Sequence, residues 1–538
     1  MTEQIKQTDV VVIGGGLGGC MAALAAAKQG LTVTLTEPTD WLGGQLTSQA
    51  VPPDEHRWIE RTGATATFRE FRERVRDYYR RNYPLTEEAR NNPILNPGNG
   101  WVSRLAHEPK IALDVLQEMM SPYIHTQRIQ VLYYTVPVEV ATEYDRIVSV
   151  TVHHTQASGS VGQYTQLIGQ YYLDATEEGD LLEQSGAEYV SGAEAKSDTD
   201  EPHALEHADP LDMQSITHVA AVDYVEGEDF TIEKPAEYEY WREYMPSFSR
   251  FPILSWYASD ANDTTKLKEF TLFPNDQGVT SLWDYRRIID PTIWEEPLRS
   301  HIQEVSLLNW AQNDYYAGAV TGVPIYERTQ NLESARQLTF SLVYWLQTEA
   351  PRLDGGKGFP GIRLRGDILG TADGLAKAPY IRESRRIKAL YTITEHDVSK
   401  ELRGDEGIKR YEDSIGVGSY SLDLHPTVKT HRTFYIPNYP FEIPLGSLIP
   451  VRITNLLPAC KNIGMTQIAG GCYRLHPVEW NIGESAGYLA AYAIQQGITP
   501  REVYESTEHV SRYQEMLSEA GVVLHWPEDV EQEVLNPQ

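Results

Sequence analysis

The sequence has little cysteine and little positive charge. Three cysteines in 538 residues cannot build a disulfide framework, and none has metal-binding spacing, so we expect a reducing compartment and no metal site. The 46 basic residues are outnumbered by 76 acidic ones, which gives a formal net charge of -30. Such a charge repels nucleic acid and anionic lipid, and the densest basic stretch, residues 69–81, is interleaved with acids. We therefore expect no nucleic-acid partner.

Long hydrophobic runs are also scarce. Residues 10–27 carry no charge, but five glycines interrupt them, and no positive leader or cleavage site accompanies them. We expect a soluble, cytoplasmic protein without a membrane span. The length favours two or three domains.

The N-terminal segment has the pattern of a nucleotide-binding unit. Residues 9–13 and 31–36 are short β-branched runs, typical of buried parallel strands. Between them a glycine-rich turn leads into residues 20–30, which we expect to form a helix of small side chains. The order of strand, glycine turn, helix and strand predicts a Rossmann unit.

Four residues of this unit would contact the nucleotide. Gly14 permits the tight turn, Gly16 lets the backbone approach a pyrophosphate, and Gly19 lets the helix pack on the strand. The N-terminus of the helix then points its partial positive charge at the phosphates. Glu37, 18 residues after Gly19, stands where a carboxylate accepts hydrogen bonds from a ribose diol.

Two further motif matches are predicted to be loops. Residues 356–361 also fit GxGxxG, but no strand precedes them and Pro360 stands where the helix should begin. Residues 203–207 match the HxxEH pattern of some zinc peptidases, yet they lack an apolar helical face that could hold two ligands. The sequence therefore offers one dinucleotide fold and no metal site.

Motifs spread along nearly the whole chain resemble FAD-dependent oxidoreductases of the glutathione-reductase type, and more narrowly a bacterial group of FAD-dependent oxidoreductases. The motifs are the glycine fingerprint and residues 42–45 (LGGQ), 173–180 (LDATEEGD), 309–314 (NWAQND), 380–386 (YIRESRR) and 474–477 (RLHP). The resemblance implies an α/β fold, with a Rossmann-type, glutathione-reductase-like FAD-binding domain and a second α+β substrate or cap domain.

The resemblance also implies the cofactor contacts. Gly43 and Gly44 would lie along the pyrophosphate and flavin, Asp174 would lie near the cofactor, and the helix from Pro477 would point its positive end at the flavin N1–C2=O edge. No histidine or cysteine lies in residues 42–45, so we expect non-covalent FAD. The implied cofactor-binding residues are Gly14, Gly16, Gly19, Glu37, Gly43, Gly44, Gln45, Asp174, Gly464, Gly471, Arg474 and Pro477.

One residue departs from the family pattern. Where relatives often have Ala-Gly-Arg, this chain has Ala459-Cys460-Lys461, and whether Lys461 replaces the arginine is open. Cys472 could reach the flavin region, but we interpret it as a buried, inert thiol.

We predict four segments. Residues 1–214 would form the first part of the FAD-binding domain, with an insertion at about 51–110 that decorates it. Residues 215–433 would form the cap, 434–505 the C-terminal part of the FAD-binding domain, and 506–538 a helical tail. Helices are expected at 68–83, 332–347 and 478–495.

The cap is rich in aromatic residues. Such residues suit a wall for an organic substrate, although each could instead belong to the core of the cap. The aromatic residues are Tyr238, Tyr240, Trp241, Tyr244, Trp256, Tyr257, Trp283, Tyr285, Trp310, Tyr315, Tyr316 and Trp345.

Three residues are catalytic candidates. Oxidation of an alcohol or amine needs a base, for which His425 is the first candidate and His476 the second. Arg382 and Arg385, expected on one helical face, could bind a substrate carboxylate or neutralise the flavin, or could pair with acids such as Glu383.

The sequence thus favours an FAD-dependent dehydrogenase or oxidase that moves a hydride from a small organic molecule to flavin N5. Oxygen, a quinone or a partner protein would take the electrons. Two alternatives stay open, namely a non-catalytic FAD-binding or assembly protein and an NAD-dependent dehydrogenase.

Overall fold

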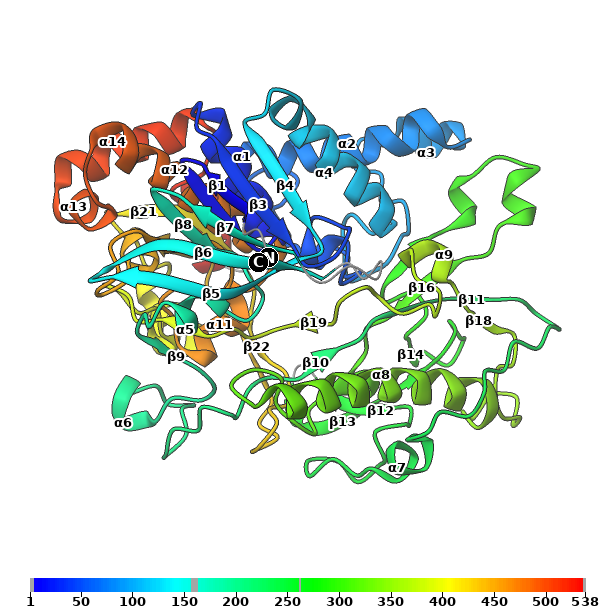
Figure 1. Cartoon of the computed structure of the whole chain (residues 1–538). Helices are drawn as coiled ribbons and strands as arrows, with labels where there is room; N and C mark the ends of the chain where they lie inside the picture. Colours follow the sequence, from blue (N-terminus) through cyan, green and yellow to red (C-terminus); the bar gives the residue numbers. More distant parts are fainter. Residues whose placement is uncertain (1–3, 156–162, 261–262, 536–538) are drawn as a thin grey trace.

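The computed structural model describes residues 4–155, 163–260 and 263–535. In Figure 1 the N-terminal and C-terminal segments form one part of the molecule, and the green middle segment forms another part beside it. One hydrophobic cluster lies in the middle segment, and a larger one joins the N-terminal and C-terminal segments and also includes middle residues such as Val219 and Leu307. Within the described residues, no helix combines the length and the apolar composition needed to cross a membrane.

A five-stranded parallel sheet lies at the centre of the first part. Its strand order is β25-β8-β2-β3-β4, and every neighbouring pair is parallel. The strands predicted at 9–13 and 31–36 are confirmed, as is the mixed α/β character of the fold. The strands are β2 (Val10–Ile13), β3 (Val33–Glu37), β4 (Ile129–Tyr133), β8 (Tyr171–Asp174) and β25 (Leu456–Pro458).

Two helices from opposite ends of the sequence pack together in backbone contact. They are α1 (Leu17–Lys28) and α12 (His476–Gln496), which confirms both predicted helices. A Cβ on Gly483 would lie 2.1 Å from the carbonyl oxygen of Gly18, and one on Gly487 would lie 2.3 Å from that of Ala22. Glycine at these two positions therefore lets the two helix N-termini lie side by side.

A second sheet continues the first part, with one parallel pair, β1–β7, and two antiparallel pairs. It has the order β1-β7-β6-β5, and its β5–β6 hairpin contains the strand predicted at 147–152. The elements are β1 (Gln4–Gln7), β5 (Thr135–Glu143), β6 (Arg146–His154), β7 (Tyr164–Ile168), α5 (Asp180–Gln184), β9 (Tyr189–Val190) and α6 (Lys196–Thr199).

The insertion after β3 is helical, as predicted for residues 68–83. Its helices are α2 (Ala66–Asn82) and α3 (Glu87–Asn91), followed by α4 (Pro109–His125). Thr65 begins α2 by accepting a hydrogen bond from the Phe68 N–H, a usual N-cap arrangement. The C-terminal tail is helical too, with α13 (Pro500–Glu505), α14 (Thr507–Glu519) and α15 (Glu528–Leu535).

The middle segment packs short sheets against one long helix, α8 (Ile325–Thr348), which contains the helix predicted at 332–347. Most of the aromatic residues noted in the sequence pack in its core rather than around a cavity. Its strands are β10 (Ile216–Thr217), β11 (Ala220–Tyr224), β12 (Tyr257–Asp260), β13 (Asp263–Thr271), β14 (Thr280–Ser281), β15 (Arg287–Ile289), β16 (Val305–Leu308), β17 (Asp314–Tyr315), β18 (Ile362–Leu364) and β19 (Tyr380–Ile381), with helices α7 (Tyr238–Glu243) and α9 (Gly366–Leu369).

The prediction of a helical face for Arg382 and Arg385 is wrong. The chain leaves β19 and enters β20 (Arg386–Ile387) without a helical turn, because β19 pairs with β10 and β20 pairs with β9. The remaining elements carry the chain back to the first part. They are α10 (Lys400–Arg403), β21 (Ser414–Gly418), β22 (Leu422–Leu424), β23 (Phe434–Ile436), β24 (Phe441–Pro444) and α11 (Gln467–Tyr473).

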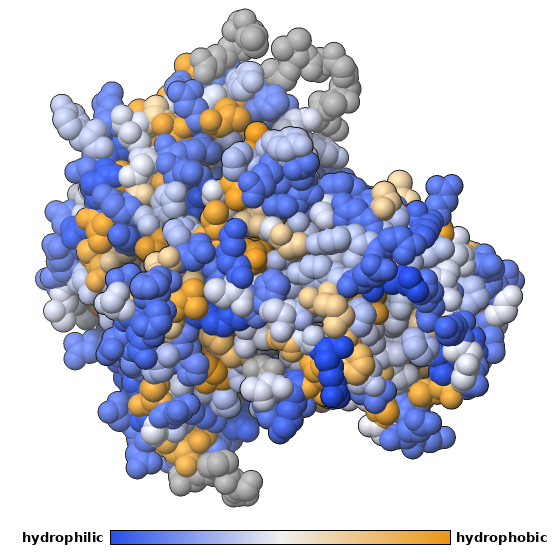
Figure 2. Space-filling view, turned by 90° about the horizontal axis from the view of Figure 1, so that it is seen from below, coloured by the Kyte–Doolittle hydropathy of each residue, from blue (hydrophilic) through white to orange (hydrophobic). Residues whose placement is uncertain are grey.

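The face shown in Figure 2 is mostly hydrophilic, and its hydrophobic residues lie in small separate groups. This distribution agrees with the excess of acidic residues over basic ones. Large apolar side chains are instead collected in the two cores.

Candidate active site

The glycine loop between β2 and α1 is tightly built. Gly14 has φ +102°, and a Cβ there would lie 2.3 Å from the carbonyl oxygen of Ala175. Gly16 is the N-cap of α1 and offers no side chain to cap the helix. A Cβ on Gly19 would lie 1.9 Å from the carbonyl oxygen of Gly14, so this glycine closes the loop onto the helix. The result is a helix N-terminus whose backbone donors can bind an anion.

A second glycine loop lies against the first. The Gly43 N–H donates to the Gly15 carbonyl at 2.8 Å, and both Gly43 and Gly44 have positive φ, +105° and +46°. A Cβ on Gly44 would lie 2.9 Å from the Gly16 Cα. Only glycine allows the two loops to come this close, and the Glu177 Oε1 lies beside both, 3.0 Å from a Cβ placed on Gly16 and 3.1 Å from one on Gly44.

Glu37 stands at the end of β3, beside the glycine loop. Its Oε1 accepts hydrogen bonds from the N–H and the hydroxyl of Thr39, at 2.7 and 2.6 Å. A Cβ on Gly15 would lie 2.7 Å from the Glu37 Oε2. Burial raises the pKa of Glu37 to about 7, against the hydrogen bonds from Thr39, which lower it.

Three of the predicted cofactor-binding residues, Asp174, Gly464 and Gly471, make close contacts within the protein. Asp174 accepts hydrogen bonds from Thr176 and from the Leu181 N–H, so its carboxylate fixes the turn into α5. A Cβ on Gly464 would lie 2.4 Å from the Ala389 Cβ, and one on Gly471, within α11, would lie 2.8 Å from the Asp423 backbone nitrogen. These glycines permit close packing around the site.

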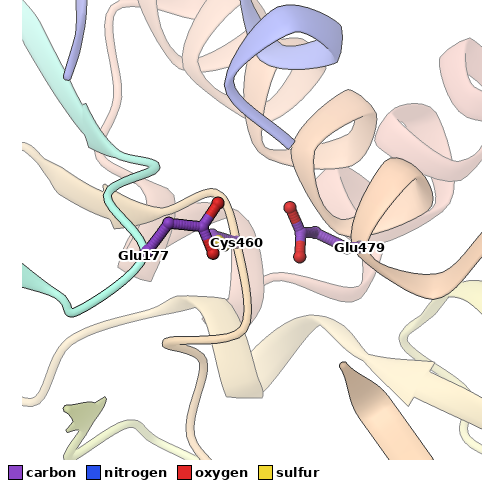
Figure 3. A group of neighbouring side chains, drawn as sticks. All are labelled: Glu177, Cys460 and Glu479. Atoms are coloured by element: carbon purple, nitrogen blue, oxygen red, sulfur yellow. The ribbon is translucent and has the colours of Figure 1, made fainter. Parts of the chain in front are cut away.

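Two carboxylates, the half-buried Glu177 and the buried Glu479, face each other near the N-termini of α1 and α12 (Figure 3). Glu479 accepts hydrogen bonds from Gln45 at 2.5 Å and from the Gly18 N–H at 3.4 Å, and Glu177 pairs with Lys461. Together with Cys460 they form a group that could hold a metal ion. The Lys461 ammonium already supplies a positive charge, however, and burial raises the pKa of the Cys460 thiol far above its usual range, which disfavours a thiolate ligand.

A cavity of about 370 Å³ lies between the middle segment and the C-terminal return of the chain. The insertion also contributes Asp54, Trp101 and Val102 to its wall, so this segment does more than decorate the first part. Four of the aromatic residues noted in the middle of the sequence reach the cavity: Tyr257, Tyr285, Trp310 and Tyr316.

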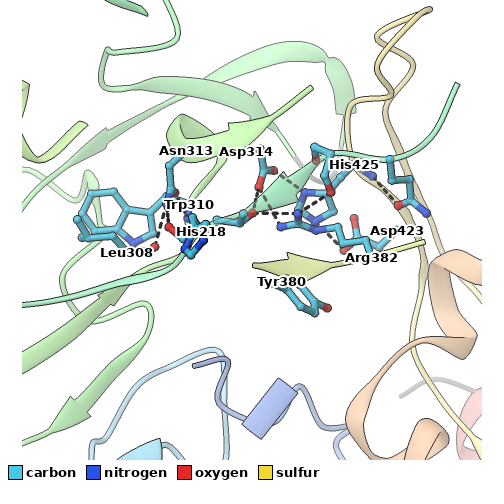
Figure 4. Close-up of polar contacts among 12 residues, drawn as sticks. His218, Leu308, Trp310, Asn313, Asp314, Tyr380, Arg382, Asp423 and His425 are labelled. Atoms are coloured by element: carbon cyan, nitrogen blue, oxygen red, sulfur yellow. Dashed lines mark hydrogen bonds and ion pairs between the residues drawn. The ribbon is translucent and has the colours of Figure 1, made fainter. Parts of the chain in front are cut away.

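His425, the first candidate for the base, lines this cavity. Its Nδ1 lies 2.6 Å from the Asp314 Oδ2, and the Arg382 Nη2 donates to the Asp314 Oδ1 at 2.9 Å (Figure 4). Asp314 thus lies between the two predicted residues and touches both. Although burial alone would raise it, Arg382 and His425 hold the pKa of Asp314 well below its usual range. The contact with the Asp314 Oδ2 holds the His425 ring with its Nδ1 toward that carboxylate.

A second carboxylate lies on the other side of the same ring. The Asp423 Oδ2 is 3.4 Å from the His425 Nε2 and 3.3 Å from the Arg474 Nη2. Arg474 also donates to the Tyr380 hydroxyl at 2.7 Å. Sequence reasoning missed both Asp314 and Asp423, although Asp314 ends the NWAQND motif and Asp423 lies two residues before His425.

His476 and Arg385, the remaining candidates from the sequence, contact other protein groups. The ring of His476 accepts a hydrogen bond from the Asp54 N–H at 3.1 Å and contacts the Val51 carbonyl at 3.1 Å, so both its nitrogens meet backbone atoms. Arg385 pairs with Glu183, and Arg386 pairs with Glu383 and Glu194.

The cysteines and the two decoy motifs behave as the sequence predicted. All three cysteines are buried and free. Residues 356–361 form a turn before β18, and residues 203–207 lie in a loop where the His203 Nδ1 contacts Glu395 at 2.9 Å.

The site fits an extended dinucleotide such as FAD. Two glycine loops and an uncapped helix N-terminus suit a diphosphate, and the buried Gln45 Oε1 and Gln49 Oε1 have no hydrogen-bond partner among the described residues. The N-cap of α12, Leu475, gives no side-chain hydrogen bond either. Among the residues that the structure describes, Lys461 is the one buried lysine, and its ammonium pairs with Glu177.

Known proteins resemble parts of this chain. A hydroxyneurosporene desaturase of Rhodobacter capsulatus is 54% identical over 47 residues, which are 9% of this chain and 9% of the desaturase. A geranylgeranyl bacteriochlorophyll reductase-like protein of Thermoplasma acidophilum matches 96% of this chain and 85% of its own at 10% identity, with a TM-score of 0.30. An L-proline dehydrogenase of P. horikoshii matches 36% of this chain and 25% of its own at 15% identity, with a TM-score of 0.19.

A family model also spans nearly the whole chain. The model described as FAD dependent oxidoreductase matches residues 9–517, which is nearly the whole length. The protein therefore belongs to the FAD-dependent oxidoreductase family, and FAD is its cofactor.

Proposed function

We propose that the protein is a dehydrogenase or oxidase in which a small organic molecule passes a hydride to flavin N5. The observation that carries the proposal is the chain of contacts from Arg382 through Asp314 to His425, at the wall of a cavity. This arrangement orients an imidazole at the cavity wall, as general-base catalysis requires.

FAD, when bound, supplies the hydride acceptor. We propose a glutathione-reductase-like placement, with the diphosphate on the loop of Gly14, Gly16 and Gly19, and the ribose at Glu37. Gly43, Gly44 and Gln45 would flank the cofactor, and the first turn of α12 at Pro477 would lie near the flavin. The glycine geometry and the uncapped N-terminus of α1 support this placement.

His425 would act as the base. Its Nε2 takes the proton from the alcohol O–H or the amine N–H, while the C–H electron pair leaves as hydride and the substrate is oxidised by two electrons. Asp314 positions the ring and stabilises the imidazolium that forms, and Arg382 in turn holds Asp314 ionised. Arg382 is thus a positioning residue in this proposal. His476 is less suited to the role, because both its ring nitrogens already meet backbone atoms.

The electrons would pass on to oxygen, a quinone or a partner protein. The chain offers one glycine fingerprint followed by a helix, and residues 356–361 lie in a turn, so no second dinucleotide site supports reduction by NAD(P)H.

An anaerobic screen of alcohols and amines tests the proposal. Bleaching of the flavin band by a member of the panel supports it, and rapid bleaching by NADH alone would reverse the direction of electron flow. With an active substrate in hand, His425→Gln should slow flavin reduction at least tenfold, about 1.4 kcal/mol of barrier. An unchanged rate removes His425 from the mechanism.

A further inference from the structure

The cavity wall carries hydrogen-bond donors that no protein group satisfies. The Arg286 Nε and Nη1, the Asn309 Nδ2 and the Trp310 Nε1 have no hydrogen-bond partner among the described residues. All three residues line the cavity, and they are only 6%, 4% and 2% exposed. A buried donor without a partner is costly, by about 1–3 kcal/mol, so a wall that keeps several is built for a ligand with acceptor atoms.

Arg286 differs from the other two arginines of the cavity. The Arg382 Nη2 donates a hydrogen bond to the Asp314 Oδ1 at 2.9 Å, and the Arg474 Nη2 lies 3.3 Å from the Asp423 Oδ2. The carboxylate nearest to Arg286 belongs to Asp54, whose Oδ1 lies 3.4 Å from its Nη1 and makes no hydrogen bond. Among the described residues, Arg286 thus has two donor atoms, Nε and Nη1, without a hydrogen-bond partner, whereas Arg382 and Arg474 each have only Nε.

Acidic and basic side chains are equal in number on the cavity wall, which carries Asp54, Asp260, Asp314 and Asp423 beside Lys268, Arg286, Arg382 and Arg474. Asp314 contacts His425 and Arg382, and Asp423 contacts His425 and Arg474, so both carboxylates are compensated. Asp54 is the acid that an anionic ligand would meet beside Arg286. Because the guanidinium has five N–H groups, it can hold Asp54 on one edge and a ligand carboxylate on another.

Aromatic and apolar side chains make up much of the remaining wall, together with polar ones such as Ser249, Gln312 and Thr433. Tyr285 lies under the Arg286 guanidinium, 5.0 Å from ring centroid to Cζ, and Phe248, Tyr420 and Tyr435 add further ring surface. A volume of about 370 Å³ is at the small end of the range for ligand pockets. The ligand should therefore be small, with one polar end and an apolar body.

We propose that the substrate is a small organic carboxylate with an apolar or aromatic body. Arg286 binds the carboxylate through its fork, and Asn309 and Trp310 donate to the remaining lone pairs. The alcohol or amine of the same molecule then faces His425 at the opposite wall. This inference rests on the proposed function, because it names the substrate class of that site.

Ligand binding to the FAD-loaded protein tests the proposal without turnover. Benzoate and phenylacetate are titrated against their neutral analogues benzamide and phenylacetamide, with the flavin spectrum and isothermal calorimetry as readouts. We expect the acids to bind at least tenfold more tightly than the amides. Equal binding, or no binding of either acid, overturns the proposal.

Two variants locate the binding group. Arg286→Met should weaken benzoate binding at least tenfold, and Asn309→Asp should do the same by placing a negative charge beside the carboxylate. Arg299→Met, an exposed arginine outside the cavity, is the matched control and should bind benzoate as the wild type does. If Arg286→Met fails to fold, Asn309→Asp alone decides, and unchanged affinity in a folded variant refutes the assignment.

The outcomes separate this inference from the proposed function. If benzoate binds selectively through Arg286 but His425→Gln reduces flavin at the wild-type rate, the carboxylate site stands and His425 is not the base. If the acids bind no more tightly than the amides but His425→Gln slows flavin reduction, His425 stands as the base and the carboxylate site is refuted.

Discussion

Replacing Gly483 by alanine should separate α1 from α12 and loosen the cofactor site between them. The new Cβ would lie 2.1 Å from the Gly18 carbonyl oxygen, about 1.3 Å short of ordinary contact at 3.4 Å. The obstacle is backbone, so the helices themselves must move. Overpacking of this kind costs about 1–3 kcal/mol, and the better helix propensity of alanine returns about 1 kcal/mol.

The net destabilisation is thus up to about 2 kcal/mol. For a chain of this length unfolding as one unit, it corresponds to a fall in Tm of about 1–2 °C. FAD retention should fall as well, because the moved helix N-termini are the ones proposed to bind the cofactor. Thermal unfolding followed by circular dichroism and by release of flavin fluorescence measures both effects.

Gly470→Ala provides the matched control. Gly470 is also helical, in α11, but a Cβ there would meet nothing closer than the Met465 Cε at 3.5 Å. This variant should be neutral or slightly more stable, with unchanged flavin content. If Gly483→Ala behaves like Gly470→Ala in both measurements, the close packing of α1 on α12 is not what shapes the site.

Three further predictions follow from the site. Asp314→Asn should slow flavin reduction about tenfold or more, because the ring of His425 loses the carboxylate that orients it; stopped-flow reduction at the wild-type rate would contradict this positioning role. Glu37→Gln should change how the stability of the FAD-free protein depends on pH. In the folded protein the pKa of Glu37 is about 7, above the ordinary 4.5, so protonated Glu37 stabilises the fold fully below pH 4.5. This stabilisation, about 3 kcal/mol, is lost as the pH rises through 7. Urea unfolding of both proteins from pH 4 to pH 8 measures the difference, and a constant difference would refute the shift. Lys461→Met should weaken FAD binding, because the negative charges of Glu177 and Glu479 beside the glycine loops would lose their positive partner. Equal FAD affinity of the two proteins in a fluorescence titration would show that Lys461 does not offset repulsion between these carboxylates and the cofactor.

The local elements were predictable because their signals are local. The β-branched runs before Gly14 and Glu37, and the periodic helix within α8, depend on neighbours in the sequence and were confirmed. The same reasoning placed the decoys in loops, since Pro360 and the residues around His203 exclude a helix there.

Contacts between distant segments were not predictable in this way. The helical face expected for Arg382 and Arg385 was wrong because strand pairing with β10 and β9 holds that stretch extended. Asp314 reaches His425 across 111 residues, and no spacing rule connects them. Gly483 and Gly487 were visible as a pair in the sequence, but their partner helix lies more than 450 residues away.

The assignment of each FAD contact remains a prediction, as do the domain boundaries at 214, 433 and 505. The larger hydrophobic cluster crosses the predicted boundary at 214, because it contains Val219, Leu307 and Tyr380 of the middle segment. The insertion contributes Asp54 and Trp101 to the cavity, which is therefore built from three stretches of the chain.

The most direct test of the account is the visible absorption spectrum of the purified protein, repeated on the supernatant after acid precipitation. The account predicts a flavin spectrum that moves to the supernatant, because no histidine or cysteine lies in the loop of residues 42–45 to attach the cofactor. Colour that stays in the pellet would show covalent attachment and contradict that loop assignment. A colourless protein that also fails to take up added FAD would contradict the central claim.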